Sequence, residues 1–257
     1  MELRPATSAT PMLAHRAEFE RILSNYRIND QALAVLRKTP FVLLVSATAG
    51  GRNTVITHLA QTGSYYYIVS DTTRPKRVKD GAEIERDGVE YFFRKEDDVL
   101  QDLKDGKFVE AAIIHNQQVS GVSIREVERA QTSGKIAITD IEVQGCETIE
   151  RLKPDVLNIF VLPPSFEEWL KRIHKRSNLT DEEVKNRLET AVQEYAVALR
   201  DKRFIFVIND KLEETVQTVD RIARLGERND AAEQAARDLA AHLRKEALAY
   251  LARYPNW

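Results

Sequence analysis

Two arginines set among hydroxyl side chains form the segment of this sequence that most directly suggests chemistry. Residues 70–77 read Ser-Asp-Thr-Thr-Arg-Pro-Lys-Arg and follow an apolar, aromatic run over residues 65–69. A guanidinium presents a rigid fork of donors that matches phosphate oxygens, and Ser or Thr hydroxyls beside it can donate further hydrogen bonds. Because Arg/Thr turns are also common on solvated surfaces, this segment alone does not identify a site. We interpret Ser70, Arg74 and Arg77 as a candidate phosphate clamp.

Four further segments carry polar residues in a recognisable order along the chain. Residues 85–91 have the spacing Glu-x-x-Gly-x-x-Tyr, Glu110 lies inside an apolar run, Asp140 and Glu142 end another, and residues 162–165 read Leu-Pro-Pro-Ser. Together with the segment over 70–77, they resemble the guanylate kinase family. The resemblance extends roughly over residues 41–224, which is most of the chain.

The segment over residues 46–54, Ser-Ala-Thr-Ala-Gly-Gly-Arg-Asn-Thr, stands between an apolar run and a helical pattern. A nucleotide kinase places G-x-x-x-x-G-K-[ST] there, and its amides and lysine hold the donor phosphates. Here Ser46 replaces the first glycine, Arg52 the lysine and Asn53 the hydroxyl residue, whereas Gly51 is retained. The segment alone leaves a functional phosphate loop and a plain strand-to-helix turn equally open. The resemblance implies ATP contacts by Ser46, Ala49, Gly50, Gly51, Arg52, Asn53, Thr54 and Asn209, and Mg²⁺ contacts by Asn53 and Asp140.

The resemblance also implies a set of residues around an acceptor, GMP: Ser70, Arg74, Arg77, Glu85, Tyr91, Glu110, Ser123 and Glu142. Glu110 is the candidate reader of guanine, because one carboxylate can accept from both N1–H and the exocyclic N2–H. Two departures from the family pattern leave alternatives open. The loop after Arg77 is long, so Asp80 or Glu83 could take the role of Glu85. A family tyrosine is lost within residues 118–122, and Ser120 or Ser123 could compensate.

Three arginines occupy the positions of the family's lid arginines: Arg172, Arg176 and Arg187. Phosphoryl transfer requires positioning and positive charge rather than a covalent nucleophile. The resemblance therefore implies that Mg-ATP phosphorylates GMP, with catalytic roles for Arg52, Arg74, Asp140, Arg172, Arg176 and Arg187. The alternatives are a guanylate-kinase-like module that binds a protein partner without activity, and a kinase with a changed acceptor preference.

The elements that must position these residues follow from the apolar pattern. Continuous apolar runs over 41–45, 136–141, 157–162 and 204–208 are each followed by a helical pattern, as in a parallel sheet covered on both faces. We expect an α/β P-loop kinase fold, a three-layer sandwich with a central parallel sheet, a small GMP-binding insertion and a helical lid. The expected domains are a tail and helical extension over 1–40, a kinase-like domain over 41–226 with its insertion at about 71–123 and lid at about 172–190, and a helical extension over 227–257.

The alanine-rich segment over 229–253 predicts one long helix, because it has no internal Pro or Gly. Its stripe of small apolar residues should rest on the amino-terminal helices or on a second subunit, so a homodimer through the terminal helices is one expectation.

Composition limits the remaining classes of function. The 257 residues are 43% hydrophobic, enough for a sizeable core, and the net charge of −2 gives no reason to expect a nucleic-acid or membrane partner. The single cysteine, Cys146, cannot form an internal disulfide, and the first residues have no secretory pattern. We therefore expect a cytoplasmic protein.

Overall fold

The structure is a computed structural model that describes residues 13–253, apart from residues 80, 115 and 176–178. It divides into two compact units, which we treat separately. The first unit comprises Met1–Lys38 and Ile68–Arg129, and the second comprises Thr39–Tyr67 and Ala130–Trp257. No helix of the described residues is long and apolar enough to cross a membrane.

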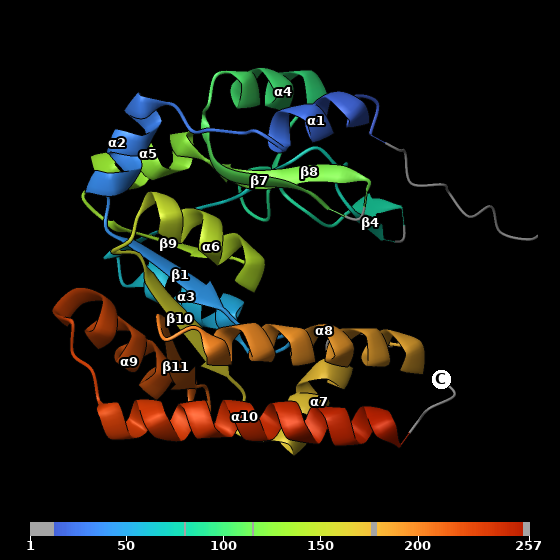
Figure 1. Cartoon of the computed structure of the whole chain (residues 1–257), viewed down its shortest axis with the longest axis vertical. Helices are drawn as coiled ribbons and strands as arrows, with labels where there is room; N and C mark the ends of the chain where they lie inside the picture. Colours follow the sequence, from blue (N-terminus) through green and yellow to red (C-terminus); the bar gives the residue numbers. More distant parts are fainter. Residues whose placement is uncertain (1–12, 80, 115, 176–178, 254–257) are drawn as a thin grey trace, which may run out of the picture. The chain divides into compact units, whose positions relative to one another are not determined.

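The second unit is built on a five-stranded sheet in the order β11-β10-β1-β9-β2 (Figure 1). Every neighbouring pair is parallel. All five side chains of β1 are buried, which explains the continuous apolar run in the sequence. The strands are β1 (Phe41–Val45), β2 (Tyr65–Tyr67), β9 (Ile136–Asp140), β10 (Leu157–Leu162) and β11 (Phe204–Ile208).

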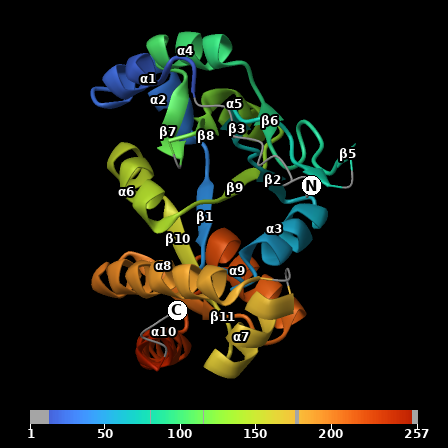
Figure 2. The ribbon, with the colours of Figure 1, turned by 90° about the vertical axis from the view of Figure 1, so that its right-hand side faces the viewer.

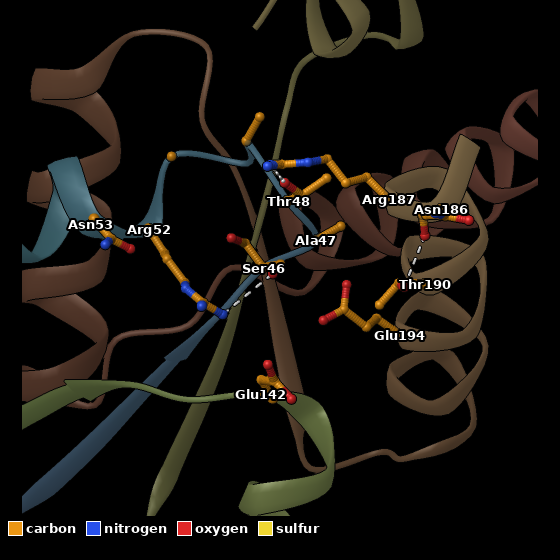
Figure 3. A pocket seen from close by; sticks show the side chains of 12 residues that line it. Ser46, Ala47, Thr48, Arg52, Asn53, Glu142, Asn186, Arg187, Thr190 and Glu194 are labelled. Carbon is orange, nitrogen blue, oxygen red and sulfur yellow. Dashed lines mark hydrogen bonds between the residues drawn. The ribbon is translucent and has the colours of Figure 1, made fainter. Parts of the chain in front are cut away.

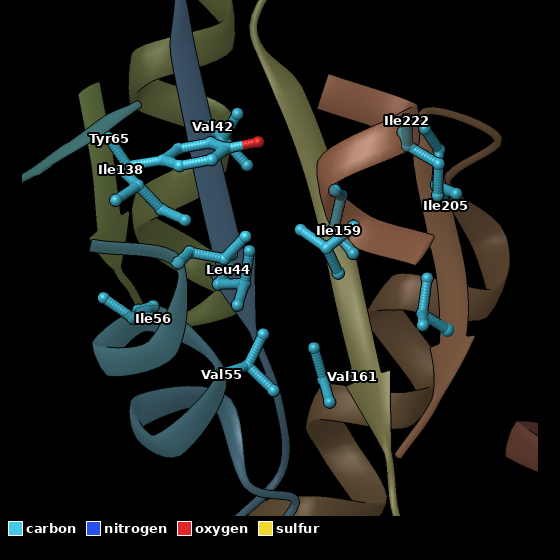
Figure 4. Packing of buried hydrophobic residues seen from close by; sticks show 13 residues of the cluster. Val42, Leu44, Val55, Ile56, Tyr65, Ile138, Ile159, Val161, Ile205 and Ile222 are labelled. Carbon is cyan, nitrogen blue, oxygen red and sulfur yellow. The ribbon is translucent and has the colours of Figure 1, made fainter. Parts of the chain in front are cut away.

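Helices cover both faces of this sheet. On one face, Val42 and Leu44 of β1 pack with Val55 of α3 and Ile222 of α9 (Figure 4). Phe160 of β10 packs instead on the ring of Tyr195, which belongs to α8. The expected α/β architecture with a central parallel sheet is therefore confirmed. The helices of this unit are α3 (Arg52–Gln61), α6 (Val143–Leu152), α7 (Phe166–Lys175), α8 (Asp181–Arg200), α9 (Leu212–Leu225) and α10 (Asp230–Ala252).

The helix α10 forms as expected, but the expectation about its packing partner was wrong. It packs on α8 and β11 of its own unit, as Figures 1 and 2 show. Ala236, Ala240 and Ala247 are buried there, and Arg237 donates hydrogen bonds to the carbonyls of Leu199 (3.1 Å) and Phe204 (2.9 Å). The small side chains allow close approach of the helices. The stripe that suggested a homodimer is thus buried inside the chain.

The first unit contains a four-stranded sheet in the order β6-β3-β8-β7, with a separate two-stranded pair, β4–β5. The amino-terminal helices belong to this unit: Phe19 of α1 shares a core with Leu103 of α4 and Phe108 of β7, and the Tyr26 hydroxyl donates to the Phe108 carbonyl at 2.7 Å. Its elements are α1 (Arg16–Leu23), α2 (Asp30–Lys38), β3 (Asp71–Thr72), β4 (Val78–Lys79), β5 (Ala82–Glu83), β6 (Phe92–Phe93), α4 (Glu96–Lys104), β7 (Phe108–Ile114), β8 (Gln118–Ser123) and α5 (Ile124–Thr132).

Candidate active site

The loop between β1 and α3 depends on glycine at two positions. Gly51, the residue before α3, has a φ of 101°, which is in the left-handed region. A Cβ atom on Gly51 would clash with Nδ2 of Asn209, and one on Gly50 would lie 2.8 Å from Cβ of Ser46. The start of α3 has no side-chain cap among the described residues, so its amides remain available to an anion. The retained glycine thus shapes a loop suited to phosphate.

Asn209 holds this loop from the end of β11. Its amide Nδ2 donates to the Gly50 carbonyl at 3.1 Å, and its Oδ1 accepts from the Thr215 hydroxyl at 3.3 Å. The side chain is buried. These two hydrogen bonds fix the conformation of the loop, and Asn209 also lines a cavity on its other side.

Trp169 of α7 fixes the loop from a second direction, since its ring N–H donates to the Thr48 carbonyl at 2.7 Å. Neither residue is a candidate in the sequence: Trp169 belongs to no motif, Thr48 stands at an unspecified position of the phosphate-loop pattern, and their contact spans 121 positions along the chain.

A cavity of about 340 Å³ lies beside the loop. Its walls come from the loop, from the residue before α6 and from α8 (Figure 3). Arg187 of α8 approaches the loop, with Nη1 at 3.3 Å from the Thr48 hydroxyl. The residues that line this cavity are Ser46, Ala47, Thr48, Ala49, Gly51, Arg52, Asn53, Glu142, Asn186, Arg187, Thr190 and Glu194.

Arg52 lines the cavity, but its guanidinium is bonded at the end of β9. It donates to the carbonyls of Ile141 (3.1 Å) and Ser46 (3.5 Å) and pairs with Asp140 at 3.5 Å. Asp140 also accepts from the Tyr67 hydroxyl at 2.8 Å. These contacts direct the Arg52 guanidinium toward the end of β9.

Glu142 lies where the sequence suggested, at the carboxyl end of β9. It is the residue before α6, but within the part of the chain that the structure describes its side chain makes no capping hydrogen bond to that helix. Glu142 lines the cavity beside the loop instead. A plain helix-capping role is thus excluded for Glu142.

Two of the three expected lid arginines line different cavities. Arg187 lies at the cavity beside the loop, whereas Arg172 lines a second cavity of about 470 Å³ together with Thr54, Asn209 and Asp210. The Arg172 guanidinium donates to the Asn209 carbonyl at 3.2 Å. Arg176 lies outside the described residues. Arg187 is therefore the lid arginine that the structure brings to the phosphate loop.

In the first unit, the candidate phosphate clamp is organised around Glu85. Its carboxylate accepts two hydrogen bonds from the Arg74 guanidinium, at 2.6 and 2.7 Å, and a third from the Arg77 amide at 2.7 Å. The Arg74 guanidinium and the Arg77 amide hold the pKa of Glu85 at about 2. Arg74 also lies over the rings of Tyr91 (5.0 Å) and Phe93 (5.4 Å). Four of the expected acceptor residues thus form one cluster.

Glu85, rather than Glu83, takes part in this cluster. The Glu83 carboxylate is exposed and pairs with Lys76 at 2.9 Å. Asp80, the other alternative, lies outside the described residues. The long loop therefore does not displace Glu85 from its expected position.

The serines of this unit divide between two places. Ser120 donates to the Thr72 hydroxyl at 2.8 Å, beside the Thr-Thr-Arg segment, and the Ser70 carbonyl accepts from the Phe92 amide at 2.9 Å. Ser123 is buried, accepts from the Arg125 amide at 3.3 Å and lines a separate cavity of about 340 Å³. Of the two candidates for replacing the missing tyrosine, Ser120 is the one bonded to the clamp segment.

Glu110 lies on β7, next to a bulge in its pairing with β8, and its side chain is half-buried. It is opposite Val122. A carboxylate on this strand can accept hydrogen bonds, as the proposed reading of guanine requires.

Asn53 and Asp140 carry oxygens of the hard kind that Mg²⁺ prefers, and the two Asp140 oxygens contact the Tyr67 hydroxyl and the Arg52 guanidinium. Magnesium takes hard oxygen ligands and commonly binds through one or two protein oxygens together with phosphates and waters. Among the residues described, no cluster of three or more His, Cys, Asp or Glu side chains could hold a metal ion. The donor set is thus suited to sharing a cation with phosphates rather than to caging one.

Comparison with known proteins gives consistent matches. The family model described as Guanylate kinase matches residues 37–225. A guanylate kinase of Sulfurimonas denitrificans is 36% identical over 190 residues, which cover 72% of this chain and 88% of the relative. One of Thermotoga maritima is 32% identical over 184 residues, 72% of this chain and 85% of the relative. A crystal structure of guanylate kinase from Anaplasma phagocytophilum shares the fold, with a TM-score of 0.55 and 24% identity over 76% of this chain and 89% of that one.

Proposed function

Because this chain belongs to the guanylate kinase family, we propose that it is a transferase that moves the γ-phosphoryl group of ATP to GMP, forming ADP and GDP. The observation that carries this proposal is the cavity in which the glycine-shaped loop meets Arg187. A loop with free helix-terminal amides binds phosphate, and an arginine beside it can stabilise the charge that develops on a transferred phosphoryl group.

The second unit supplies the donor site in this proposal. The amides after Gly50 would bind the donor phosphates, Arg52 would exchange its carbonyl partners for phosphate oxygens, and Arg187 would contact the moving group. Asn53 and Asp140 would hold Mg²⁺, which neutralises phosphate charge when bound. Arg172, at the neighbouring cavity with Thr54 and Asn209, would contact the rest of the nucleotide.

The first unit supplies the acceptor site. Arg74 and Arg77 would bind the phosphate of GMP, and Glu85 would keep Arg74 oriented through its two hydrogen bonds. Glu110 would accept from the N1–H and N2–H groups of guanine. Ser70, Tyr91, Ser123 and Glu142 complete the proposed acceptor set. Positioning and charge are sufficient for this chemistry, because the phosphoryl group passes directly between two bound nucleotides.

The proposed domain limits are those expected from the sequence, with a kinase domain over 41–226 between two helical extensions, and the family match over 37–225 supports them. We also propose a cytoplasmic location, which the presence of only one cysteine supports. The named relatives do not favour the alternative of an inactive binding module.

Acceptor choice tests this proposal. With Mg-ATP in excess, we expect GMP to be phosphorylated faster than AMP, CMP or UMP, with discrimination on the order of 10⁴-fold, because a mismatched base would present an acceptor rather than donors to the Glu110 carboxylate. Glu110→Gln should reduce this preference, whereas Asp98→Asn, on the exposed surface of α4, should not. Comparable rates with AMP, or equal effects of the two substitutions, would refute the role of Glu110.

A further inference from the structure

Glu194 is an acidic residue of the phosphate-loop cavity to which the proposed mechanism gives no role. It lies on α8, seven residues after Arg187, so two helical turns bring both side chains to the same face. Its side chain lines the cavity and points toward Ser46 and Glu142 in Figure 3. The residue is only 8% exposed. Glu194 is thus a buried acidic side chain in the cavity that the proposed function assigns to the donor phosphates, which carry the same sign of charge.

The surroundings of Glu194 offer it little compensation. Within the described part of the chain, its carboxylate accepts no hydrogen bond and forms no ion pair. Arg52 is the nearest opposing charge from α3, but its guanidinium is bonded to Asp140 and to main-chain carbonyls. Arg187 is directed to Thr48. From the start of α6, Glu142 presents a second carboxylate.

These surroundings favour the neutral acid. Burial, opposed by Arg52 and assisted by the Glu142 carboxylate, raises the pKa of Glu194 to about 7. A bound triphosphate would add negative charge to the same cavity. An ionised Glu194 would repel that charge, whereas a protonated carboxyl can donate an O–H hydrogen bond to a phosphate oxygen.

We propose that Glu194 is a further binding residue of the donor site, which holds a proton and donates a hydrogen bond to the donor phosphates, so that binding of Mg-ATP takes up a proton from solvent. This inference rests on the proposed function, because it requires the cavity to bind a donor nucleotide. No covalent bond changes in the step: a solvent proton moves to the Glu194 carboxylate as the nucleotide enters.

Because binding of Mg-ATP takes up a proton, the affinity for Mg-ATP should decrease as the pH rises. Below about pH 7, Glu194 is already protonated and binding needs no proton. Above pH 7, the carboxylate must first be protonated, so the affinity for Mg-ATP should fall by about tenfold between pH 7 and pH 8.5. Glu194→Gln keeps a hydrogen-bond donor at this position without a titratable group, and should remove the contribution of Glu194 to this decrease.

Calorimetric titration of the full chain with Mg-ATP tests the proposal. Measurements at pH 8 in two buffers with different ionisation enthalpies give the number of protons taken up on binding. We expect about one more proton for the native protein than for Glu194→Gln. Protonation of the nucleotide itself contributes equally to both and cancels. Glu189→Gln, an exposed acid on the same helix, is the matched control and should behave like the native protein.

Any one of the following results would overturn the inference. Native protein and Glu194→Gln could take up the same number of protons, or Glu194→Gln could bind Mg-ATP more weakly at every pH, as expected of a purely structural residue. Proton uptake by the native protein is measured without any variant, so its absence at pH 8 refutes the inference even if Glu194→Gln does not fold. If the native protein binds no Mg-ATP at any pH, the donor site of the proposed function fails together with this inference.

Discussion

Glu85→Gln should destabilise the chain and weaken GMP binding, because it breaks a buried, charge-assisted cluster. The side chains of Glu85 and Arg74 are only 7% and 12% exposed. The Arg74 guanidinium donates two hydrogen bonds to the Glu85 carboxylate, and the Arg77 amide donates a third. A glutamine has one acceptor oxygen, and its NH₂ group would face the guanidinium. Arg74 would then lose the partner that orients it toward an acceptor phosphate.

The size of the effect follows from the pKa of Glu85, which falls from 4.5 to about 2 on folding. A difference of about 2.5 units corresponds to about 3 kcal/mol of unfolding free energy at neutral pH. Because the folded-state pKa is lowered, this stabilisation is complete above about pH 5 and declines as the pH falls toward 2. Less than about half of it should remain at pH 3.

Urea denaturation at pH 7 and pH 3 measures this difference directly. The control is Glu83→Gln, which removes an exposed partner of Lys76 from the same loop and should leave stability unchanged within error. We also expect Glu85→Gln to raise the KM for GMP by about tenfold, as loss of one charge-assisted hydrogen bond would. Two results would refute this reasoning. Glu85→Gln and Glu83→Gln could lower the free energy of unfolding equally at pH 7, or the loss caused by Glu85→Gln could be as large at pH 3 as at pH 7.

Three other substitutions or truncations test separate parts of the structure. Gly51→Ala must displace Asn209 or the loop, so we expect initial-rate kinetics to show a KM for Mg-ATP that is raised at least about tenfold. The control is Gly63→Ala: Gly63 also has a left-handed backbone, but no described atom lies near the position of its Cβ, so this KM should stay unchanged. Arg187→Ala should slow turnover by about 10³-fold with little change in the affinity for Mg-ATP. If the variant turns over as fast as the native protein, Arg187 has no part in catalysis. Truncation before α10 uncovers α8 and β11 and should lower the melting temperature measured by circular dichroism; an unchanged melting curve would contradict the packing described.

The sheet of the second unit was predictable because burial on both faces leaves a simple pattern in the sequence. The runs over 41–45, 157–162 and 204–208 are strands with those limits, and only Ile141 falls outside the strand expected over 136–141. Thr180 and Glu183, which are only three positions apart, form a capping box at the start of α8, a local feature of the kind that a sequence pattern can show.

Contacts between distant parts of the chain could not be predicted in the same way. The sequence shows that α10 has a stripe of small residues, but not that α8 and β11 are the surface on which it packs. The hydrogen bond from Asn209 to Gly50 spans 159 positions, so no local pattern could reveal it. Glu194 gives no signal at all, since an acid on a helix is usually exposed and only the assembled cavity shows that it is buried.

The central claim is that the altered phosphate loop still supports transfer from ATP to GMP. Its most direct test is to incubate the native protein with Mg-ATP and GMP and to quantify all nucleotides by anion-exchange chromatography over time. We expect ADP and GDP to appear in equal amounts. The formation of each should require GMP and Mg²⁺, and Arg187→Ala should slow the formation of ADP and of GDP to the same extent. Formation of ADP without GDP, or no turnover at all, would contradict it.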